Sequence, residues 1–348
     1  MFRQMVRVAL CAGTFIGVIG SGHLPVYAEI HPSFVVSGRI TTSVPVKSVR
    51  IVLEDPKKKG VAVAETTVDE DGSYELRNLT LRSYRIVAWL DGKKQDSRKL
   101  DILCRPGTVM KKSFFYGKNE PAFTFYFPLE DPEVADVQEI LVSVPPGVMK
   151  EYGKAQTDYV NGNTRSALFR LEALLPLAPE FYGLHTRLGM LYEQSGCYGD
   201  AETEYQRAGE LSPRSSQPLL NLARAQIQGS EGMPDEMDQL SLALENLERA
   251  IALKPTSAVA HCLAGAAYER SDSAAEAELS FKRALELDSN MPAARLMLAY
   301  LYMRQEDWSS SKEQLDTYLE DHPFARDRTL VKSLISEVSY KLVSADHL

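Results

Sequence analysis

The chain has 348 residues, a hydrophobic fraction of 44% and a formal net charge of −8 at pH 7. A chain of this length can bury sizeable cores, and its four cysteines are too few for the disulfide framework of a small secreted scaffold. The acidic balance argues against a nucleic-acid partner, because proteins that bind nucleic acids present basic patches to the phosphates.

The charge is divided unevenly along the chain. Residues 32–130 carry 17 Lys and Arg against 12 Asp and Glu, whereas residues 131–348 carry 20 against 34. Opposite charges could draw the two regions together. The interpretation that the sequence favours is that the acidic residues form solvated helix faces.

The first 28 residues have the pattern of a signal peptide. Arg3 and Arg7 precede an apolar stretch over residues 8–20, and residues 26–28 end on Ala28, where a signal peptidase would cleave. We therefore expect an exported protein, periplasmic or secreted. The apolar stretch is short for a membrane span, so no integral span is expected after cleavage, although an uncleaved anchor is the alternative.

Between residues 34 and 116 apolar side chains recur at every second position, most clearly over residues 49–53 and 84–90, which predicts strands with one buried face. The sequence Asp-Glu-Asp-Gly at residues 69–72 predicts a tight turn. Asp69 and Asp71 could instead bind calcium, but calcium needs more oxygen ligands than this segment offers. Several short strands joined by turns predict an antiparallel β-sandwich.

The order of these segments resembles the carboxypeptidase regulatory-like, transthyretin-like domain. The resemblance covers residues 32–118 and rests on Ser37-Gly38-Arg39-Ile40, residues 49–53 and residues 67–74. Leu81-Arg82-Ser83 stands where the family usually has Pro-Pro-Gly. The resemblance implies an accessory folding module of exported proteins with no catalytic residues.

Residues 119–147 are rich in proline and carry Phe123, Phe125 and Phe127; we expect a stiff connector, or a final strand of the sandwich.

The second half of the chain is repetitive. Five similar helical patterns end at Pro179, Pro213, Pro255, Ser289 and Pro323, with spacings of 34, 42, 34 and 34 residues. Small and large residues recur in register within each unit. The second unit has Leu188, Gly189, Tyr192, Ala201, Tyr205 and Ala208, and the fourth has Ala264, Gly265, Tyr268, Ala277, Phe281 and Ala284. This pattern resembles the tetratricopeptide repeat, in which two helices pack as a pair.

The expected fold is therefore a multidomain chain, all-β and then all-α: a small antiparallel β-sandwich followed by a right-handed α-solenoid. The five expected units cover residues 148–181, 182–215, 216–257, 258–291 and 292–325. Eight extra residues in the third unit are expected in the turn between its helices, around Gly229, Gly232 and Pro234. Residues 326–348 should form a helix that caps the last unit.

The three cysteines beyond the signal segment, Cys104, Cys197 and Cys262, are expected to be free thiols. Cys197 falls in a turn between helices and Cys262 on the first helix of another unit, so that pair does not suit a disulfide.

No enzyme motif is found in the sequence. The six histidines are scattered without metal-ligand spacing, and His185 and His261 share one repeat position, where core packing explains both. We expect no enzyme activity, no cofactor and no metal.

The resemblance implies that the first helices of the units line a concave groove that binds peptides or partner segments. The groove positions are Tyr152, Tyr159, Met190, Glu193, Leu220, Arg224, Ile227, Glu269, Tyr300, Met303 and Arg304. Exposed Tyr, Met and Arg are enriched at interfaces, so Arg224, Tyr300 and Arg304 are the expected anchors. The groove lacks the Lys and Asn set with which chaperone-binding relatives grip a terminal carboxylate.

We therefore expect a non-catalytic exported scaffold or adaptor that binds a protein or peptide partner through this groove. Exported bacterial proteins that join the two modules are the nearest resemblance. One alternative is an envelope or cell-surface module in which the sandwich recognises a glycan or peptide, and an exposed Trp89 would favour it. Another alternative is an accessory subunit of an enzyme complex.

Overall fold

The structure is a computed structural model that describes residues 34–116 and 144–345. Short gaps within these ranges fall at residues 43–47, 59, 70–71, 80–82, 106–107, 112–113, 232, 324 and 326. The expected signal peptide and most of the expected connector lie outside the described residues.

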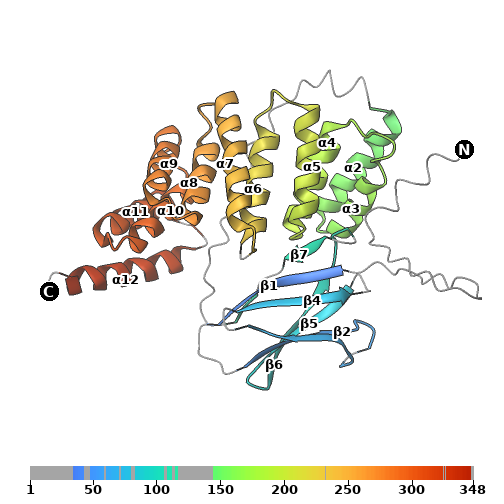
Figure 1. Cartoon of the computed structure of the whole chain (residues 1–348), viewed down its shortest axis with the longest axis horizontal. Helices are drawn as coiled ribbons and strands as arrows, with labels where there is room; N and C mark the ends of the chain where they lie inside the picture. Colours follow the sequence, from blue (N-terminus) through green and yellow to red (C-terminus); the bar gives the residue numbers. More distant parts are fainter. Residues whose placement is uncertain are drawn as a thin grey trace, which may run out of the picture. The chain divides into compact units, whose positions relative to one another are not determined.

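The N-terminal domain consists of two four-stranded sheets (Figure 1). The first sheet contains β1 (Phe34–Thr42), β4 (Ser73–Leu79), β7 (Val109–Lys111) and β8 (Phe114–Tyr116). The second has the order β3 (Ala62–Thr67), β2 (Val49–Glu54), β5 (Ser83–Leu90) and β6 (Lys93–Asp101). Its strand pairs are antiparallel, as predicted. In the first sheet, β1 pairs antiparallel with β4 but parallel with β7 and β8, so the expectation of an antiparallel sandwich is wrong there. The chain reaches β7 from the other sheet, and such a crossover allows a parallel pair.

Alternating side chains of both sheets share one core. Phe34 and Val36 of β1 are at most 1% exposed, as are Ile51 of β2 and Tyr84 of β5, and all four belong to one cluster. The turn predicted near Asp69 is present: the N–H of Gly72 donates to the Asp69 carbonyl (2.9 Å), and Gly72 has a φ of 87°. Glycine suits this position because it adopts positive φ at no steric cost.

The rest of the described chain is helical, and its helices stand side by side in sequence order in Figure 1. The first two pairs are α2 (Pro146–Val160) with α3 (Thr164–Glu172) and α4 (Tyr182–Gln194) with α5 (Tyr198–Leu211). Next come α6 (Gln217–Ser230) with α7 (Glu236–Leu253) and α8 (Ala258–Arg270) with α9 (Ala274–Leu287). The last pair is α10 (Pro292–Arg304) with α11 (Trp308–Asp321), followed by α12 (Arg328–Ala345). These eleven described helices confirm the predicted fold, a β domain followed by a tetratricopeptide-like array. No helix within the described ranges has the length and apolar character needed to cross a lipid bilayer.

Small and large residues meet inside the α4–α5 and α8–α9 pairs, as the repeat pattern predicts. A Cβ built on Gly265 of α8 would lie 2.5 Å from Cε1 of Phe281 on α9, and Phe281 is fully buried. Only glycine allows the two helices to approach so closely, because any side chain there would overlap the ring.

The insertion in the third unit is partly helical, so the expectation that it lies entirely in the turn is wrong. Helix α7 has 18 residues, whereas α5, α9 and α11 have 14 each. The first turn of α7 carries Glu236 and Asp238, which the positive end of the helix dipole stabilises.

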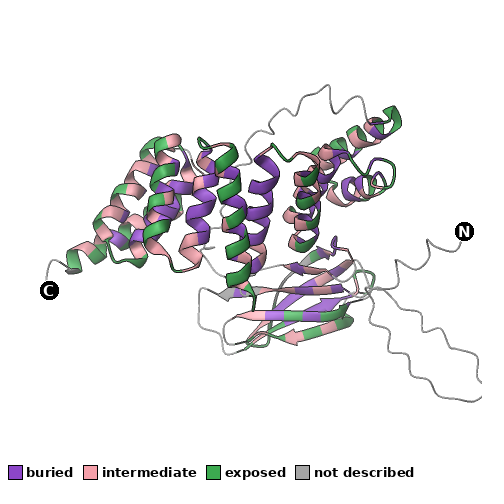
Figure 2. Ribbon diagram, turned by 45° about the horizontal axis from the view of Figure 1, so that its top comes forward, coloured by how far each residue is buried: buried purple, intermediate pink, exposed green. Residues whose placement is uncertain are grey.

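Helix α12 covers the end of the array. Its Val331 and Val338 are fully buried in one cluster with Leu315 and Tyr318 of α11. In Figure 2 buried residues lie mainly where helices face one another, and exposed residues lie on their outer sides. The predicted capping helix is thus present.

Candidate functional site

All eleven predicted groove residues lie on the first helices of the pairs: α2, α4, α6, α8 and α10. Their exposure differs strongly along the array. On α6 the side chains of Leu220, Arg224 and Ile227 are buried, at 1%, 5% and 4% exposure. Helix α6 lies in the middle of the array and contacts α5, α7 and α8. On α10, by contrast, Tyr300 and Met303 are partly exposed and Arg304 is exposed.

Arg224 makes an internal ion pair between neighbouring units. Its Nε and Nη2 lie 2.6 and 2.8 Å from the two carboxylate oxygens of Glu193 on α4. The hydroxyl of Tyr205 donates to the same carboxylate (2.7 Å). Burial opposes the charged guanidinium, but the hydrogen bonds and charge of Glu193 outweigh it and raise the pKa of Arg224. Arg224 therefore ties α6 to α4 in this structure, a role that the sequence did not indicate.

Arg304 makes a similar contact in a solvent-exposed place. It pairs with Glu269 at the end of α8 and with Asp272 in the following turn, 2.9 Å away. Its side chain is 52% exposed, and that of Asp272 is 86% exposed. An ion pair in such a position is weak, because water competes for both charges. Arg304 can therefore exchange these partners for those of an incoming chain.

The predicted aromatic positions on α2, Tyr152 and Tyr159, contact the next unit. The hydroxyl of Tyr152 donates to the carbonyl of Gly183 (3.2 Å), and its ring lies 5.1 Å from that of Phe181. Gln194 donates to the hydroxyl of Tyr159 (2.9 Å). Met190 packs partly buried against the same core. This end of the array uses its aromatic residues for packing between units.

A second notable region joins the sandwich to the second unit. Cys104, in the loop after β6, forms a disulfide with Cys197 in the turn between α4 and α5, with Cα atoms 5.2 Å apart. The expectation of free thiols is therefore wrong for these two residues. It is right for Cys262, which is buried in α8. No local sequence signal pairs Cys104 with Cys197, because nothing near either residue shows that the sandwich loop reaches this turn.

Polar contacts surround the disulfide. Asp200 at the start of α5 accepts hydrogen bonds from the N–H of Arg105 (2.9 Å) and the hydroxyl of Thr108 (3.2 Å). The N–H of Lys111 in β7 donates to the carbonyl of Gly196 (2.9 Å). The sandwich thus contributes the cation Arg105 and the array contributes the carboxylates. At this junction a cation from the basic N-terminal region therefore pairs with carboxylates from the acidic helical region.

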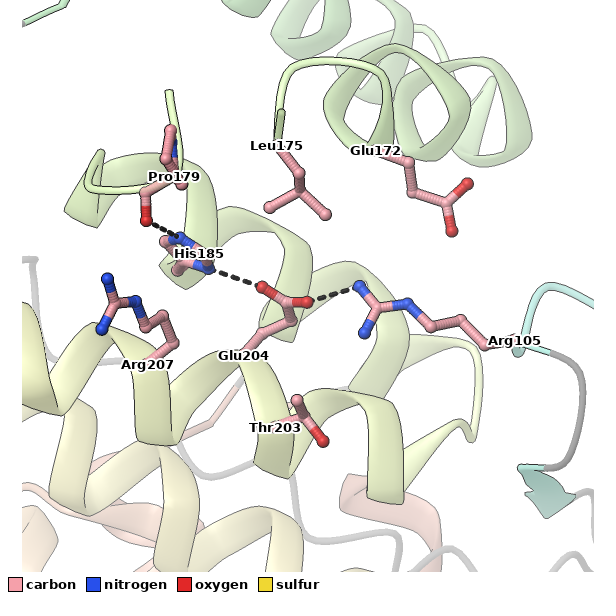
Figure 3. Close-up of a pocket in the computed structure, with 8 residues that line it drawn as sticks. All are labelled: Arg105, Glu172, Leu175, Pro179, His185, Thr203, Glu204 and Arg207. Atoms are coloured by element: carbon pink, nitrogen blue, oxygen red, sulfur yellow. Dashed lines mark hydrogen bonds and ion pairs between the residues drawn. The ribbon is translucent and has the colours of Figure 1, made fainter. Parts of the chain in front are cut away.

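A pocket of about 490 Å³ opens beside this junction (Figure 3). Its polar residues form a chain: Arg105 pairs with Glu204, the other oxygen of Glu204 lies 2.7 Å from Nδ1 of His185, and Nε2 of His185 lies 3.0 Å from the Pro179 carbonyl. Burial raises the pKa of Glu204, but the hydrogen bonds from His185 and Arg105 outweigh it, so the net shift is downward. Glu204 is therefore a buried carboxylate held by two donors.

The chain of contacts gives His185 a role beyond core packing. It is 6% exposed and spans from the end of the first unit to α5. Arg105 also lies over the ring of Tyr192, 5.0 Å from its centroid. Both carboxylate oxygens of Glu204 are hydrogen-bonded, one to Arg105 and one to His185. These bonds hold the sandwich loop on the array. They do not activate a nucleophile.

A second cleft, of about 370 Å³, lies between β7 and the helices α5 to α7. Glu202 on its wall has a pKa raised to about 7, first by burial and then by the charge of Asp235. Lys111 from β7 also lines it and donates to the Glu231 carbonyl (2.9 Å). Burial lowers the pKa of Lys111.

Trp89 was the residue that could distinguish a glycan-binding sandwich. It is partly buried on β5, and the guanidinium of Arg50 lies 5.5 Å from the centroid of its ring. Glu65 holds Arg50 in place from β3 (3.4 Å). One face of the indole is thus occupied by a neighbouring side chain, which argues against a sugar platform on that face.

Comparison with known proteins agrees with the helical part of the fold. The tetratricopeptide repeat model matches residues 270–337, which run from the end of α8 into α12. This match spans less than half of the chain. No curated protein matches the sequence.

Solved structures similar to this chain are helical repeat proteins. A tetratricopeptide repeat protein of Thermus thermophilus, TTC0263, is 22% identical, with a TM-score of 0.48 over 56% of this chain and 99% of that one. The type IV pilus biogenesis factor PilW is 16% identical, with a TM-score of 0.48 over 59% of this chain and 91% of that one. A tetratricopeptide repeat protein of Parabacteroides merdae is 20% identical, with a TM-score of 0.46 over 57% and 74%.

Proposed function

We propose that this chain is an exported, non-catalytic scaffold that binds a protein partner through the first-helix face of its repeats, centred on α10. The observation that carries the proposal is the contrast between α10 and α6. Tyr300 and Met303 are partly exposed and Arg304 is exposed on α10, whereas Arg224 and Ile227, which stand on α6 at the positions of Tyr300 and Met303, are buried. Tyr, Met and Arg combine apolar contact with hydrogen bonding, which makes them common anchors of protein interfaces.

The end of the groove near α10 also has the charges that a partner could exploit. Arg304 and Asp272 are exposed and Glu269 beside them is partly buried, so the cluster offers charges of both signs. A partner segment with its own acidic or basic group could replace one of these weak ion pairs, and the remaining charges would orient the segment on the surface. Leu220 and Ile227 would then form the buried floor beside the binding face, and Arg224 would hold that floor rigid.

Export rests on two independent features. The first 28 residues have the sequence pattern of a signal peptide, and the Cys104–Cys197 disulfide is of a kind that persists in oxidising compartments. The sandwich, which resembles the carboxypeptidase regulatory-like module, would then be an accessory domain of the scaffold. The covered face of Trp89 favours this role over glycan recognition.

The partner face can be tested by site-specific photo-crosslinking in the native envelope. A photoreactive residue at Met303 should give a specific crosslink to a partner, and the additional changes Tyr300→Ala and Arg304→Ala should weaken it at least fivefold, which corresponds to about 1 kcal/mol. A matched control places the photoreactive residue at Leu279 and changes Arg283 to Ala, both exposed on α9. Equal crosslinking from both helices, or no loss in the α10 variant, would contradict the proposal.

A further inference from the structure

The turn between α4 and α5 is adapted to the loop of the sandwich. Among the described turn residues of the array, four have positive φ: Gly162 and Gly196 at 77° and 78°, and Asp272 and Glu306 at 56° and 60°. Gly162 and Gly196 are 34 positions apart, and so are Asp272 and Glu306. The 76 positions between Gly196 and Asp272 equal one repeat of 34 plus the longer repeat of 42, so all four residues occupy one repeat position. Asp272 and Glu306 show that this backbone conformation does not by itself require glycine here.

At Gly196 a second constraint acts. A Cβ on Gly196 would overlap the carbonyl oxygen of Lys111, a backbone atom of β7 that cannot swing aside. Around Gly162 there is no atom within 4 Å of the same Cβ position. The absence of a side chain at Gly196 thus allows β7 to approach the turn closely, whereas no other segment approaches Gly162.

The contacts at this turn come from separate residues of the loop. Arg105 and Thr108 reach Asp200, the guanidinium of Arg105 reaches Glu204, and Lys111 bonds to Gly196. Cys104 and Cys197 are both fully buried among them. Two cysteines 93 residues apart can be joined only when their Cα atoms come within about 7 Å. The polar contacts and the glycine provide this approach.

We propose that the Cys104–Cys197 disulfide is a docking-dependent clamp: Cys104, Arg105, Thr108 and Lys111 of the sandwich first dock on the turn of the second unit and on α5, and oxidation then fixes the sandwich to the array. The clamp makes the sandwich a fixed part of the scaffold. Because both sulfurs are buried, the closed clamp should resist reductants until the loop undocks.

Closing the clamp requires a disulfide donor, such as an oxidoreductase of the thioredoxin class or oxidised glutathione. The thiolate of one cysteine attacks the donor disulfide and forms a mixed disulfide. The thiolate of the other cysteine then displaces the donor sulfur, so the donor takes up two electrons and the protons of the two protein thiols and ends as one dithiol, or as two molecules of reduced glutathione. Dithiothreitol reverses the reaction and is itself oxidised to a cyclic disulfide.

A matched pair of variants tests whether docking precedes oxidation. The full chain is produced in an exporting host, free thiols are alkylated, and the peptide that joins Cys104 to Cys197 is quantified by mass spectrometry. Gly162→Asp should leave the linked fraction at the wild-type level, because aspartate tolerates this backbone conformation. Gly196→Asp should lower it at least fivefold. Equal linkage in the two variants, or alkylation of both cysteines in the wild type, would overturn the proposal.

Thermal melts give a second measure that does not depend on Gly196. Dithiothreitol should lower the Tm of the wild type by about 5–10 °C, as expected for a crosslink that closes a long loop. The Cys104→Ser, Cys197→Ser double variant should melt at the reduced value and not respond. Cys262→Ala should respond like the wild type. An unchanged Tm in fully reduced wild type, or one bound zinc per chain in place of the linked peptide, would refute the clamp. None of these measurements involves α10, so they are independent of the partner face.

Discussion

Gly189 of α4 and Tyr205 of α5 meet so closely that a Cβ built on the glycine would lie 2.5 Å from Cε1 of the ring and 2.9 Å from its Cζ. Tyr205 cannot yield easily, because it is fully buried and its hydroxyl donates to Glu193. This contact repeats at Gly265 and Phe281 and sets the spacing of the helix pairs.

The contact predicts that even the smallest side chain is harmful there. Gly189→Ala should lower the free energy of unfolding by about 1–3 kcal/mol, because the methyl group overpacks the pair. Gly153→Ala is the matched control: this glycine is exposed within α2 and has no atom within 4 Å of its Cβ position. There alanine should be neutral or stabilise by up to about 1 kcal/mol. Chemical denaturation measures both, and equal effects would show that the helix pair is not packed as described.

The two arginines of the groove should differ sharply in their effect on stability. Arg224→Ala leaves the carboxylate of Glu193 without its buried partner and should cost about 3 kcal/mol. Arg304→Ala removes an exposed pair and should cost less than about 1 kcal/mol. The sequence indicated both arginines as exposed anchors, and the burial of Arg224 corrects this for one of them. Melting curves of the two single variants decide the matter; similar values would refute the internal role of Arg224.

The sequence predicted those features that depend on local periodicity. The pairing of Gly189 with Tyr205 is visible because the same residue types recur at Gly265 and Phe281 with the same spacing. The strand pattern of residues 49–53 and the turn before Ser73 follow equally from neighbouring residues. The capping helix could be read from its apolar spacing.

What the sequence could not give depends on contacts between distant segments. The disulfide joins a loop of the sandwich to a turn of the array, and neither end carries a local signal for the other. The parallel pairing of β1 with β7 and β8 arises from the path of the chain between sheets. The burial of Arg224 arises because α6 packs against α5, α7 and α8, contacts that a per-residue pattern does not contain.

Glu202 should make stability depend on pH. Its pKa in the folded protein is raised to about 7 by burial and then by Asp235, from an ordinary value of 4.5. Between these values the folded state keeps a proton that the unfolded state has lost, so stability falls as the pH rises from about 4.5 to 7. Glu202→Gln should therefore stabilise the protein at pH 8 by about 1 kcal/mol, a figure reduced for partial exposure, and have no effect at pH 4.

Urea denaturation at the two pH values measures this difference. Glu210→Gln serves as the control, because Glu210 lies on the same helix with its side chain 65% exposed. A gain of equal size at pH 4 and pH 8, or the same gain in the control, would show that ionisation of Glu202 carries no cost in the folded state.

Removal of α12 should destabilise the array and promote self-association. Residues 328–348 bring Val331 and Val338 onto Leu315 and Tyr318 of α11, so their deletion exposes an apolar face. The two buried valines alone account for about 3 kcal/mol. Tyr318 would remain hydrogen-bonded to Asp327, which precedes the deletion, so the loss is mainly apolar. Tyr340→Ser, at a position 72% exposed on α12, should change neither property. Light scattering and thermal melts test this: a truncated protein that stays monomeric and melts with the wild type would show that α12 does not cap the array.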